Sequence, residues 1–220
     1  MHPIDLVEDV AIGFGYNKIA EEYSHYPMTA TIGGTMKINR LCDNVREECA
    51  ACGFVEMLLF SLCPKEDEVF GKLDIEITNA KTSTFTHGRS SLIPGLLKSA
   101  SCNQFKQLPL QLFECSEVFK LDDSADNDVG ATTEKHLGAL YGGVTDGFAT
   151  LHGLLDKVGK RLGKTVKLER EDNDLCYAGR RAAVSLNGKR IGWIGTPKIP
   201  ILDMYKVPFP VTVFEIKLDV

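Results

Sequence analysis

The stretch AAVSLNGKRIGW, residues 182–193, decides the fold class. It places Asn187-Gly188 between two short runs rich in apolar residues, and an Asn-Gly pair in this setting is a strong signal of a two-residue hairpin turn. A second, longer pair of strands is predicted at residues 110–121 and 135–144, on either side of an acidic loop. Because a hairpin joins two strands that run in opposite directions, the sheet is expected to be mainly antiparallel.

Helices are predicted among these strands, without the regular strand–helix alternation of a parallel sheet. The apolar residues of segment 37–52 recur at helical spacing, and Gly53 follows as a terminating glycine. Segment 54–63 is a dense apolar run that predicts a buried strand, whereas segment 17–35 predicts an irregular connector. The other predicted elements are helices at 4–16, 64–73, 90–105, 148–162 and 197–205, and strands at 74–79, 166–171 and 211–218. The expected fold is therefore α+β, with a mixed, mainly antiparallel sheet flanked by helices.

The composition excludes several classes of function. The 220 residues carry a net charge of −5, and 44% of them are apolar, as in an ordinary globular protein. No basic stripe is visible, so strong binding of nucleic acid by this chain alone is not expected. No apolar run is long enough to span a membrane, and no secretory signal is present, so we expect no membrane partner and a cytoplasmic location.

Seven cysteines include the CxxC pair Cys49 and Cys52. Such a pair is compatible with a zinc or redox site, or with two thiols that are simply buried in a reducing compartment. Because no second pair follows at zinc spacing, the sequence favours buried thiols.

Three carboxylates lie on one face of the first predicted helix. Asp5, Glu8 and Asp9 stand at i, i+3 and i+4, which are neighbouring positions on a helix surface. One interpretation is a solvated acidic first turn that is stabilised by the helix dipole. The other is part of a site for a hard cation such as magnesium, which requires further oxygen ligands from elsewhere.

Common catalytic motifs are missing from the sequence. It contains no glycine-rich phosphate loop, no HExxH helix and no GxSxG turn. His87, His136 and His152 are far apart, with no acid–base partner implied, and we expect them to be surface or hydrogen-bonded structural residues.

Four stretches together resemble one protein family. They are DLVEDVAIGFGYNKI from residue 5, RSSLIPGLLKSA from residue 89, PLQLFECSEVF from residue 109, and AGRRAAV with IGWIGTPKI from residues 178 and 191. They resemble the C-terminal, catalytic-like module of the beta subunits of cytosolic, eukaryotic/archaeal-type phenylalanyl-tRNA synthetases. The resemblance implies a class II aminoacyl-tRNA synthetase-like fold at residues 19–220, preceded at residues 1–18 by the last helix of a small helical domain.

The resemblance also implies a function in translation. The chain would be part of a ligase that attaches phenylalanine to tRNA-Phe, as the partner of a catalytic alpha subunit in a heterotetramer. ATP would bind in the alpha subunit only, because Phe119 is followed here by Lys120-Leu121-Asp122 rather than by the Arg-x-Glu that contacts ATP in catalytic relatives. Segment IGWIGTPKIP likewise offers Lys198 but no arginine. We therefore expect no catalytic or cofactor-binding residue in this chain and no activity from it alone. The alternative is an independent small-molecule-binding or regulatory domain that reuses the synthetase fold.

The family has a magnesium site made of four carboxylates, and the resemblance assigns its last three positions to Asp5, Glu8 and Asp9. The first position would fall before Met1. We therefore expect magnesium in the full-length subunit and at most a partial site in this chain.

Two further expectations follow from the resemblance and from local chemistry. Segment 37–52 is expected to form the interface with the alpha subunit, because its apolar stripe is widened by Cys42, Met36, Ala50 and Ala51, and the isolated chain is then expected to self-associate. The alternative is a helix that is covered only by its own domain. Arg89 and Arg180 flank turns, where a guanidinium can bind several carbonyl groups, and are expected to be structurally important; the alternative is that they are surface charges.

Overall fold

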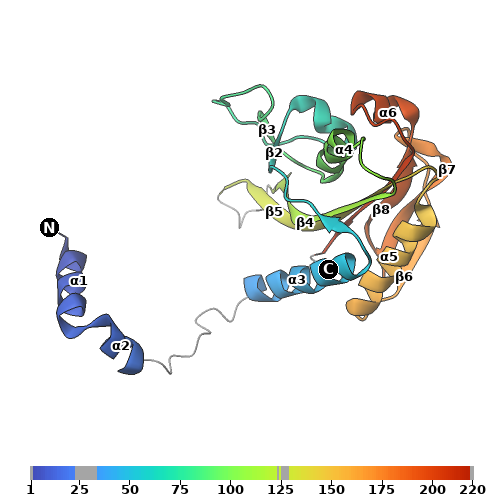
Figure 1. The fold of residues 1–220 in the computed structure, drawn as a ribbon. Helices are drawn as coiled ribbons and strands as arrows, with labels where there is room; N and C mark the ends of the chain where they lie inside the picture. The colour runs from blue at the N-terminus through green and yellow to red at the C-terminus, as the bar shows by residue number, and fades with distance from the viewer. Residues whose placement is uncertain (1, 23–33, 123, 125–128, 219–220) are drawn as a thin grey trace. The chain divides into compact units, whose positions relative to one another are not determined.

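The computed structural model describes residues 2–22, 34–122, 124 and 129–218, and divides the chain into two compact units, Met1–Lys37 and Ile38–Val220 (Figure 1). The first unit contains α1, Pro3–Phe14, and α2, Tyr16–Glu22. Helix α1 begins with a capping box, in which the His2 side chain accepts from the Ile4 N–H and Asp5 accepts from the His2 N–H. The predicted connector at 17–35 is thus helical up to Glu22, and its residues 23–33 lie outside the described part of the chain. The boundary predicted after residue 18 stays a prediction.

The second unit is built on a seven-stranded sheet with the order β1-β4-β5-β9-β8-β7-β6. Every neighbouring pair is antiparallel except β1 with β4, which confirms the predicted sheet. The longest ladder joins β4, Leu110–Leu121, to β5, Ala131–Gly142. The other strands are β1 (Val55–Glu56), β6 (Val166–Arg170), β7 (Cys176–Leu186), β8 (Lys189–Pro197) and β9 (Val211–Lys217).

The Asn187-Gly188 hairpin forms as predicted between β7 and β8. Both turn residues have positive φ, 49° and 84°, which is the conformation that makes Asn-Gly the favoured pair. The predicted strands were too short at their outer ends, since β7 begins at Cys176 and β8 continues to Pro197.

The two edge strands of the sheet, β1 and β6, differ in length. At one edge, β1 contributes only Val55 and Glu56. At the other, β6 has the sequence VKLER and exposes Lys167, Glu169 and Arg170.

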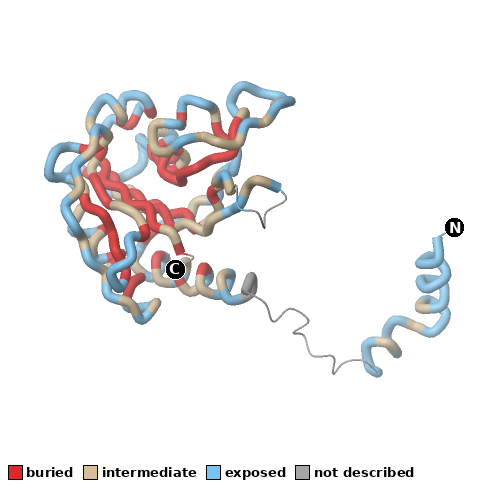
Figure 2. The backbone as a smooth tube through the Cα atoms, turned by 180° about the vertical axis from the view of Figure 1, so that it is seen from behind, coloured by how far each residue is buried: buried red, intermediate tan, exposed pale blue. Residues whose placement is uncertain are grey.

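Helices cover both faces of the sheet, so the fold has three layers, and the buried residues concentrate in the middle one (Figure 2). Helices α3, Gly34–Ala51, and α5, Phe148–Arg161, pack on one face around Phe113, Leu137 and Phe214. Helices α4, Ile93–Cys102, and α6, Ile199–Met204, pack on the opposite face around Leu112, Leu140 and Val213 (Figure 1). Because successive strand residues point to opposite faces, each strand serves both cores.

Helix α3 buries a single apolar face. Cys42, Val45 and Cys49 are buried against the sheet, as the helical spacing predicts. Ala50 and Ala51, on the face that a partner is expected to cover, are exposed within this chain, and the side chain of Met36 lies outside the described residues. That a partner covers this face stays a prediction. The outward surface of α3 is therefore polar or small in character.

Segment 54–63 is not the buried strand that its apolar run predicts. The chain leaves the sheet after β1 and forms the short strand β2, Leu62–Cys63, which pairs in a separate two-stranded sheet with β3, His87–Gly88. Between β1 and β2, Leu58 is 86% and Phe60 79% exposed. The predicted strand at 74–79 is likewise reduced to one bridge between Glu76 and His87, while the helix predicted from Pro64 is the 3-10 helix η1, Lys65–Phe70.

The cysteines are mainly buried thiols, as the sequence favours. Cys42, Cys49, Cys63, Cys115 and Cys176 are buried, and no disulfide joins any of the seven. Burial raises the pKa of Cys49 to about 12, so its thiol stays protonated at neutral pH. In the described residues, no helix is long and apolar enough to cross a membrane.

Gly192 marks the closest approach between β8 and β9. A Cβ atom at this position would lie 2.0 Å from the carbonyl oxygen of Glu215 and 2.8 Å from the Cα of Ile216. We expect Gly192→Ala to lower the free energy of unfolding by about 1–3 kcal/mol, because backbone atoms must move apart. Gly153→Ala, at an open position of α5, is expected to raise it by roughly 0.5–1 kcal/mol. Urea unfolding of both variants measures this, and equal effects would contradict the close approach.

Candidate functional site

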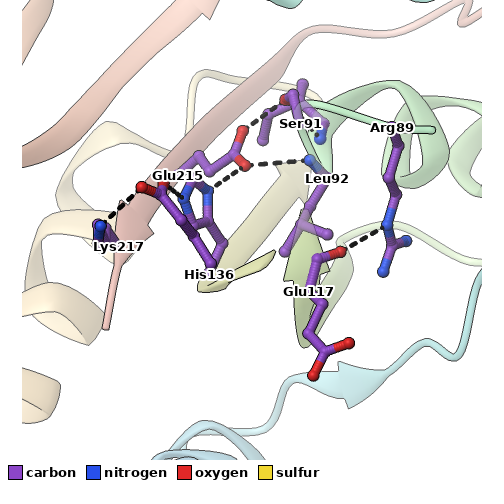
Figure 3. A network of polar contacts seen from close by, with 9 residues as sticks. Arg89, Ser91, Leu92, Glu117, His136, Glu215 and Lys217 are labelled. Carbon is purple, nitrogen blue, oxygen red and sulfur yellow. Dashed lines mark hydrogen bonds and ion pairs between the residues drawn. The ribbon is translucent and has the colours of Figure 1, made fainter. Parts of the chain in front are cut away.

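Arg89 lies just before α4 and joins three segments of chain, and Figure 3 shows its contact with Glu117 on β4. Its Nη1 donates to Glu114 Oε1 at 2.8 Å and to the carbonyl oxygen of Phe60 at 3.4 Å, and its Nε donates to the carbonyl oxygen of Glu117 at 3.0 Å. Its own backbone N–H donates to the Ser61 carbonyl. The expectation that Arg89 is structural and binds carbonyl groups is confirmed.

The Arg89–Glu114 ion pair is almost fully removed from water. The two side chains are 5% and 1% exposed. Glu114 also accepts the Leu59 N–H at 3.4 Å. Burial nevertheless raises the pKa of Glu114, because desolvation outweighs the attraction of Arg89. Removal of either partner would leave the other charge unpaired in the core.

A second buried carboxylate, Glu215 on β9, fixes the start of α4 (Figure 3). Ser91 Oγ donates to its Oε2 at 2.5 Å, and the Leu92 N–H donates to its Oε1 at 3.1 Å. His136 Nδ1 lies 2.8 Å from the same Oε1. The expectation that His136 is a hydrogen-bonded structural residue is confirmed. Its partners were not implied by the sequence, since strand pairing brings together residues that are far apart in the chain.

The network continues outward from His136 to the surface. Its Nε2 lies 3.3 Å from Glu134 Oε2, and Lys217 Nζ donates to Glu134 Oε1 at 2.7 Å. Burial alone would raise the pKa of Glu134, but the hydrogen bonds from Lys217 and His136 together lower it. Each described member of this network thus binds another part of the chain.

A cavity of about 610 Å³ opens beside this network, between η1, the β2–β3 sheet and α4. Most of its lining is apolar, including Met57, Leu59 and Phe85. The two cations that line it are neutralised, since Arg89 binds Glu114 and Lys98 binds Asp67 at 2.5 Å. Within the described residues, Nη2 of Arg89 and Oε2 of Glu114 are buried without a hydrogen-bond partner.

The two lysines that the resemblance sets in place of arginines are found on β4 and at the start of α6. Lys120 lies at the end of β4, next to Phe119, whose N–H donates to the Arg89 carbonyl. Lys198 forms the N-cap position of α6. Of the acidic residues that follow β4, Asp122 is described, whereas 123, 126 and 128 lie outside the described residues.

Arg180 differs from Arg89. Its side chain is 56% exposed and pairs with Asp146 at 2.6 Å. Such an exposed pair contributes little to stability. The expectation that Arg180 is structurally important is therefore wrong, and its side chain is a surface charge.

The three predicted magnesium ligands do not form a site by themselves. Asp5, Glu8 and Asp9 are exposed on α1, and Asp5 Oδ2 already accepts the His2 N–H at 2.7 Å. Within the described ranges, no group of three or more His, Cys, Asp or Glu side chains is arranged to hold a metal ion. This donor set does not fit magnesium, which requires near-octahedral oxygen coordination.

Comparisons with known proteins agree with the sequence resemblance. The family described as "Phenylalanyl tRNA synthetase beta chain CLM domain" matches residues 23–218. The phenylalanine–tRNA ligase beta subunit of Mus musculus is 34% identical over 234 residues, and that of Dictyostelium discoideum is 35% identical over 246 residues. A relative in Arabidopsis thaliana, 32% identical, is named as the cytoplasmic beta subunit. In each case the match covers 100% of this chain but only 39% of the relative.

Solved structures share the fold. Two structures of pyrrolysyl-tRNA synthetase from Desulfitobacterium hafniense align with TM-scores of 0.63 and 0.66 at 11% and 12% identity. They cover 92% of this chain and 70% and 71% of the synthetase chains. The class II synthetase-like fold expected from the resemblance is confirmed.

The Arg89–Glu114 pair generates a prediction about stability. Arg89→Met should lower the free energy of unfolding by about 3–5 kcal/mol, because it leaves Glu114 buried without its cation. The double variant Arg89→Met/Glu114→Leu should recover a large part of that loss, since apolar side chains can replace a buried ion pair at little net cost. Chemical unfolding of both variants measures the difference. A double variant that is less stable than Arg89→Met would contradict this account.

Proposed function

Because the chain belongs to the phenylalanyl-tRNA synthetase beta-chain family, we propose that it is the non-catalytic, synthetase-like part of a phenylalanine–tRNA ligase beta subunit. It pairs with the catalytic alpha subunit in a cytoplasmic heterotetramer that attaches phenylalanine to tRNA-Phe with ATP. The ATP site belongs to the alpha subunit. The match over the whole chain favours this proposal over an independent small-molecule-binding or regulatory domain.

The contacts of Arg89 support the non-catalytic role. The sheet face beside α4 holds a buried arginine, but that arginine is bound by Glu114 and by backbone carbonyl groups. Arginines that stabilise a reacting phosphate must instead be free to bind it. Arg89 therefore acts on the fold, by holding segment 59–61 and the start of α4 against β4.

The surface around β1 is the proposed contact with the alpha subunit. Val55 and Leu58 are exposed apolar residues at the edge of the sheet, immediately after α3. Exposed apolar side chains beside a sheet edge are typical of a protein interface. The polar outer face of α3 forms the rim of the same surface. Without the alpha subunit, this surface favours self-association.

In this proposal, only the full-length subunit binds magnesium. We expect calorimetry with MgCl₂ to detect no one-to-one site of micromolar affinity in this chain, because three exposed carboxylates on one helical turn leave most of the coordination to water. Glu8→Ala should leave the titration unchanged. A micromolar site that Glu8→Ala abolishes would overturn this prediction.

Capture by the alpha subunit tests the function. The purified chain should bind a tagged alpha subunit, and it should show no phenylalanine-dependent ATP–pyrophosphate exchange on its own. Leu58→Asp should weaken capture at least about tenfold, because it places a charge in an apolar interface. Val144→Asp is the matched control, since Val144 is equally exposed but lies after β5.

Arg46→Glu is unsuitable as a test of this surface, although Arg46 lies on α3. Its guanidinium binds Asp43, Glu56 and the Cys115 carbonyl, so a charge reversal there would disturb the fold. Failure of the parent chain to bind the alpha subunit, or exchange activity from the chain alone, would refute the proposed function.

A further inference from the structure

Basic side chains gather at one corner of the second unit, although the whole chain is acidic. The segment from the end of α5 through β6, KVGKRLGKTVKLER at residues 157–170, carries six basic residues and one acidic residue. The hairpin between β7 and β8 adds Lys189 and Arg190. The sequence gives no hint that these two segments meet.

Backbone contacts bring the two segments together. The Asn187 N–H donates to the Thr165 carbonyl at 3.2 Å, and the Thr165 N–H donates to Asn187 Oδ1 at 3.2 Å. Strand β6 pairs with β7, with Lys167 opposite Ser185, and Ser185 pairs in turn with Arg190. The end of α5, the first residues of β6 and the hairpin tip therefore form one corner of the molecule.

Four lysines of this corner are exposed and form no ion pair with the described residues. They are Lys157, Lys160, Lys167 and Lys189, which we call the basic corner. The acidic residues nearby are largely engaged elsewhere, since Glu171 binds Arg181 and Arg190, Asp172 binds Arg170, and Glu47 binds Arg161. Glu169 is the exposed acid on β6, two residues beyond Lys167.

The chemistry of the basic corner fits a phosphate backbone. Lysine ammonium groups are point charges on flexible stems, which suit the repeated phosphates of a polynucleotide. None of the large exposed aromatic side chains of the described residues lies in α5, β6 or the β7–β8 turn, so a platform for stacking bases is missing there. Such a surface recognises the backbone and its shape rather than a base sequence.

We propose that the basic corner binds the sugar–phosphate backbone of the RNA that the ligase complex acts on. The choice of RNA rests on the proposed function, whereas the surface itself rests on the geometry of α5, β6 and the β7–β8 turn. The corner positions RNA and takes no part in the chemistry.

Salt dependence of RNA binding is the first measurement. Fluorescence anisotropy of a labelled tRNA-Phe transcript with the 220-residue chain should give binding at low salt that weakens with a slope of about −3 to −4 in log K against log salt, as roughly four phosphate contacts require. Lack of binding at about 50 mM salt, where such contacts are strong, would overturn the proposal.

Charge reversal locates the surface. The variant Lys157→Glu/Lys160→Glu/Lys189→Glu should weaken binding at low salt by at least about tenfold and reduce the slope by roughly 2 to 3. The matched control is Lys65→Glu/Lys81→Glu/Lys106→Glu, which changes the net charge equally at exposed lysines on other elements. The control should retain affinity within about threefold, since it keeps the contacts. Equal losses in both variants would show that overall charge, not the corner, controls binding, and would overturn the proposal.

Two further measurements distinguish RNA binding by the basic corner from other outcomes. Both variants should keep the melting temperature of the parent and should be captured by the alpha subunit, so a failure of RNA binding is distinguishable from a failure of the proposed function. Vesicles containing phosphatidylserine test a membrane partner. Binding to these vesicles through the same lysines, with no preference for tRNA, would refute an RNA surface.

Discussion

The buried ion pair between Arg89 and Glu114 is the interaction on which the arrangement of the α4 face depends. The guanidinium of Arg89 binds β4 through the Glu114 carboxylate and the Glu117 carbonyl, and it also binds the carbonyl of Phe60. Arg89 itself belongs to the chain that leads into α4. Water cannot compete at this site, because both side chains are almost fully buried. The position of α4, and hence the wall of the neighbouring cavity, follows from this contact and from the parallel anchoring of Ser91 and Leu92 by Glu215.

The buried charged groups Arg89, Glu114 and Glu215 hold distant segments of this chain together. A buried ion pair contributes little net stability over apolar packing, but it fixes geometry, because each group must meet its partner at a defined distance. The face of the sheet beside α4 thus holds buried polar side chains that are bound to other parts of the chain, although Nη2 of Arg89 and Oε2 of Glu114 have no hydrogen-bond partner. This is consistent with a module whose role is to present surfaces to other components of a complex.

Local signals in the sequence predicted most of the regular elements. The β4–β5 ladder, the Asn187-Gly188 turn and helices α3 and α5 depend on alternation, turn chemistry and helical spacing, which are visible in a short window. Segment 54–63 was misjudged because an apolar run does not reveal whether its neighbours are strands or solvent. The partnership of Glu215, His136 and Ser91 could not be predicted, because strand register brings together residues from distant parts of the chain. The family resemblance supplied the fold class, but neither the internal role of Arg89 nor the exposed position of Arg180.

The unequal edges of the sheet have a consequence for how the protein behaves at high concentration. An open strand edge is a template for pairing with other chains and therefore for aggregation. Strand β6 presents alternating lysine and glutamate at its edge, and charged side chains of this kind discourage a second strand from docking there. Strand β1 contributes only two residues to its edge, which is too short a ladder to recruit another sheet. Both edges of the seven-stranded sheet are thus protected against pairing with a strand of another chain, which is the first step of fibril formation.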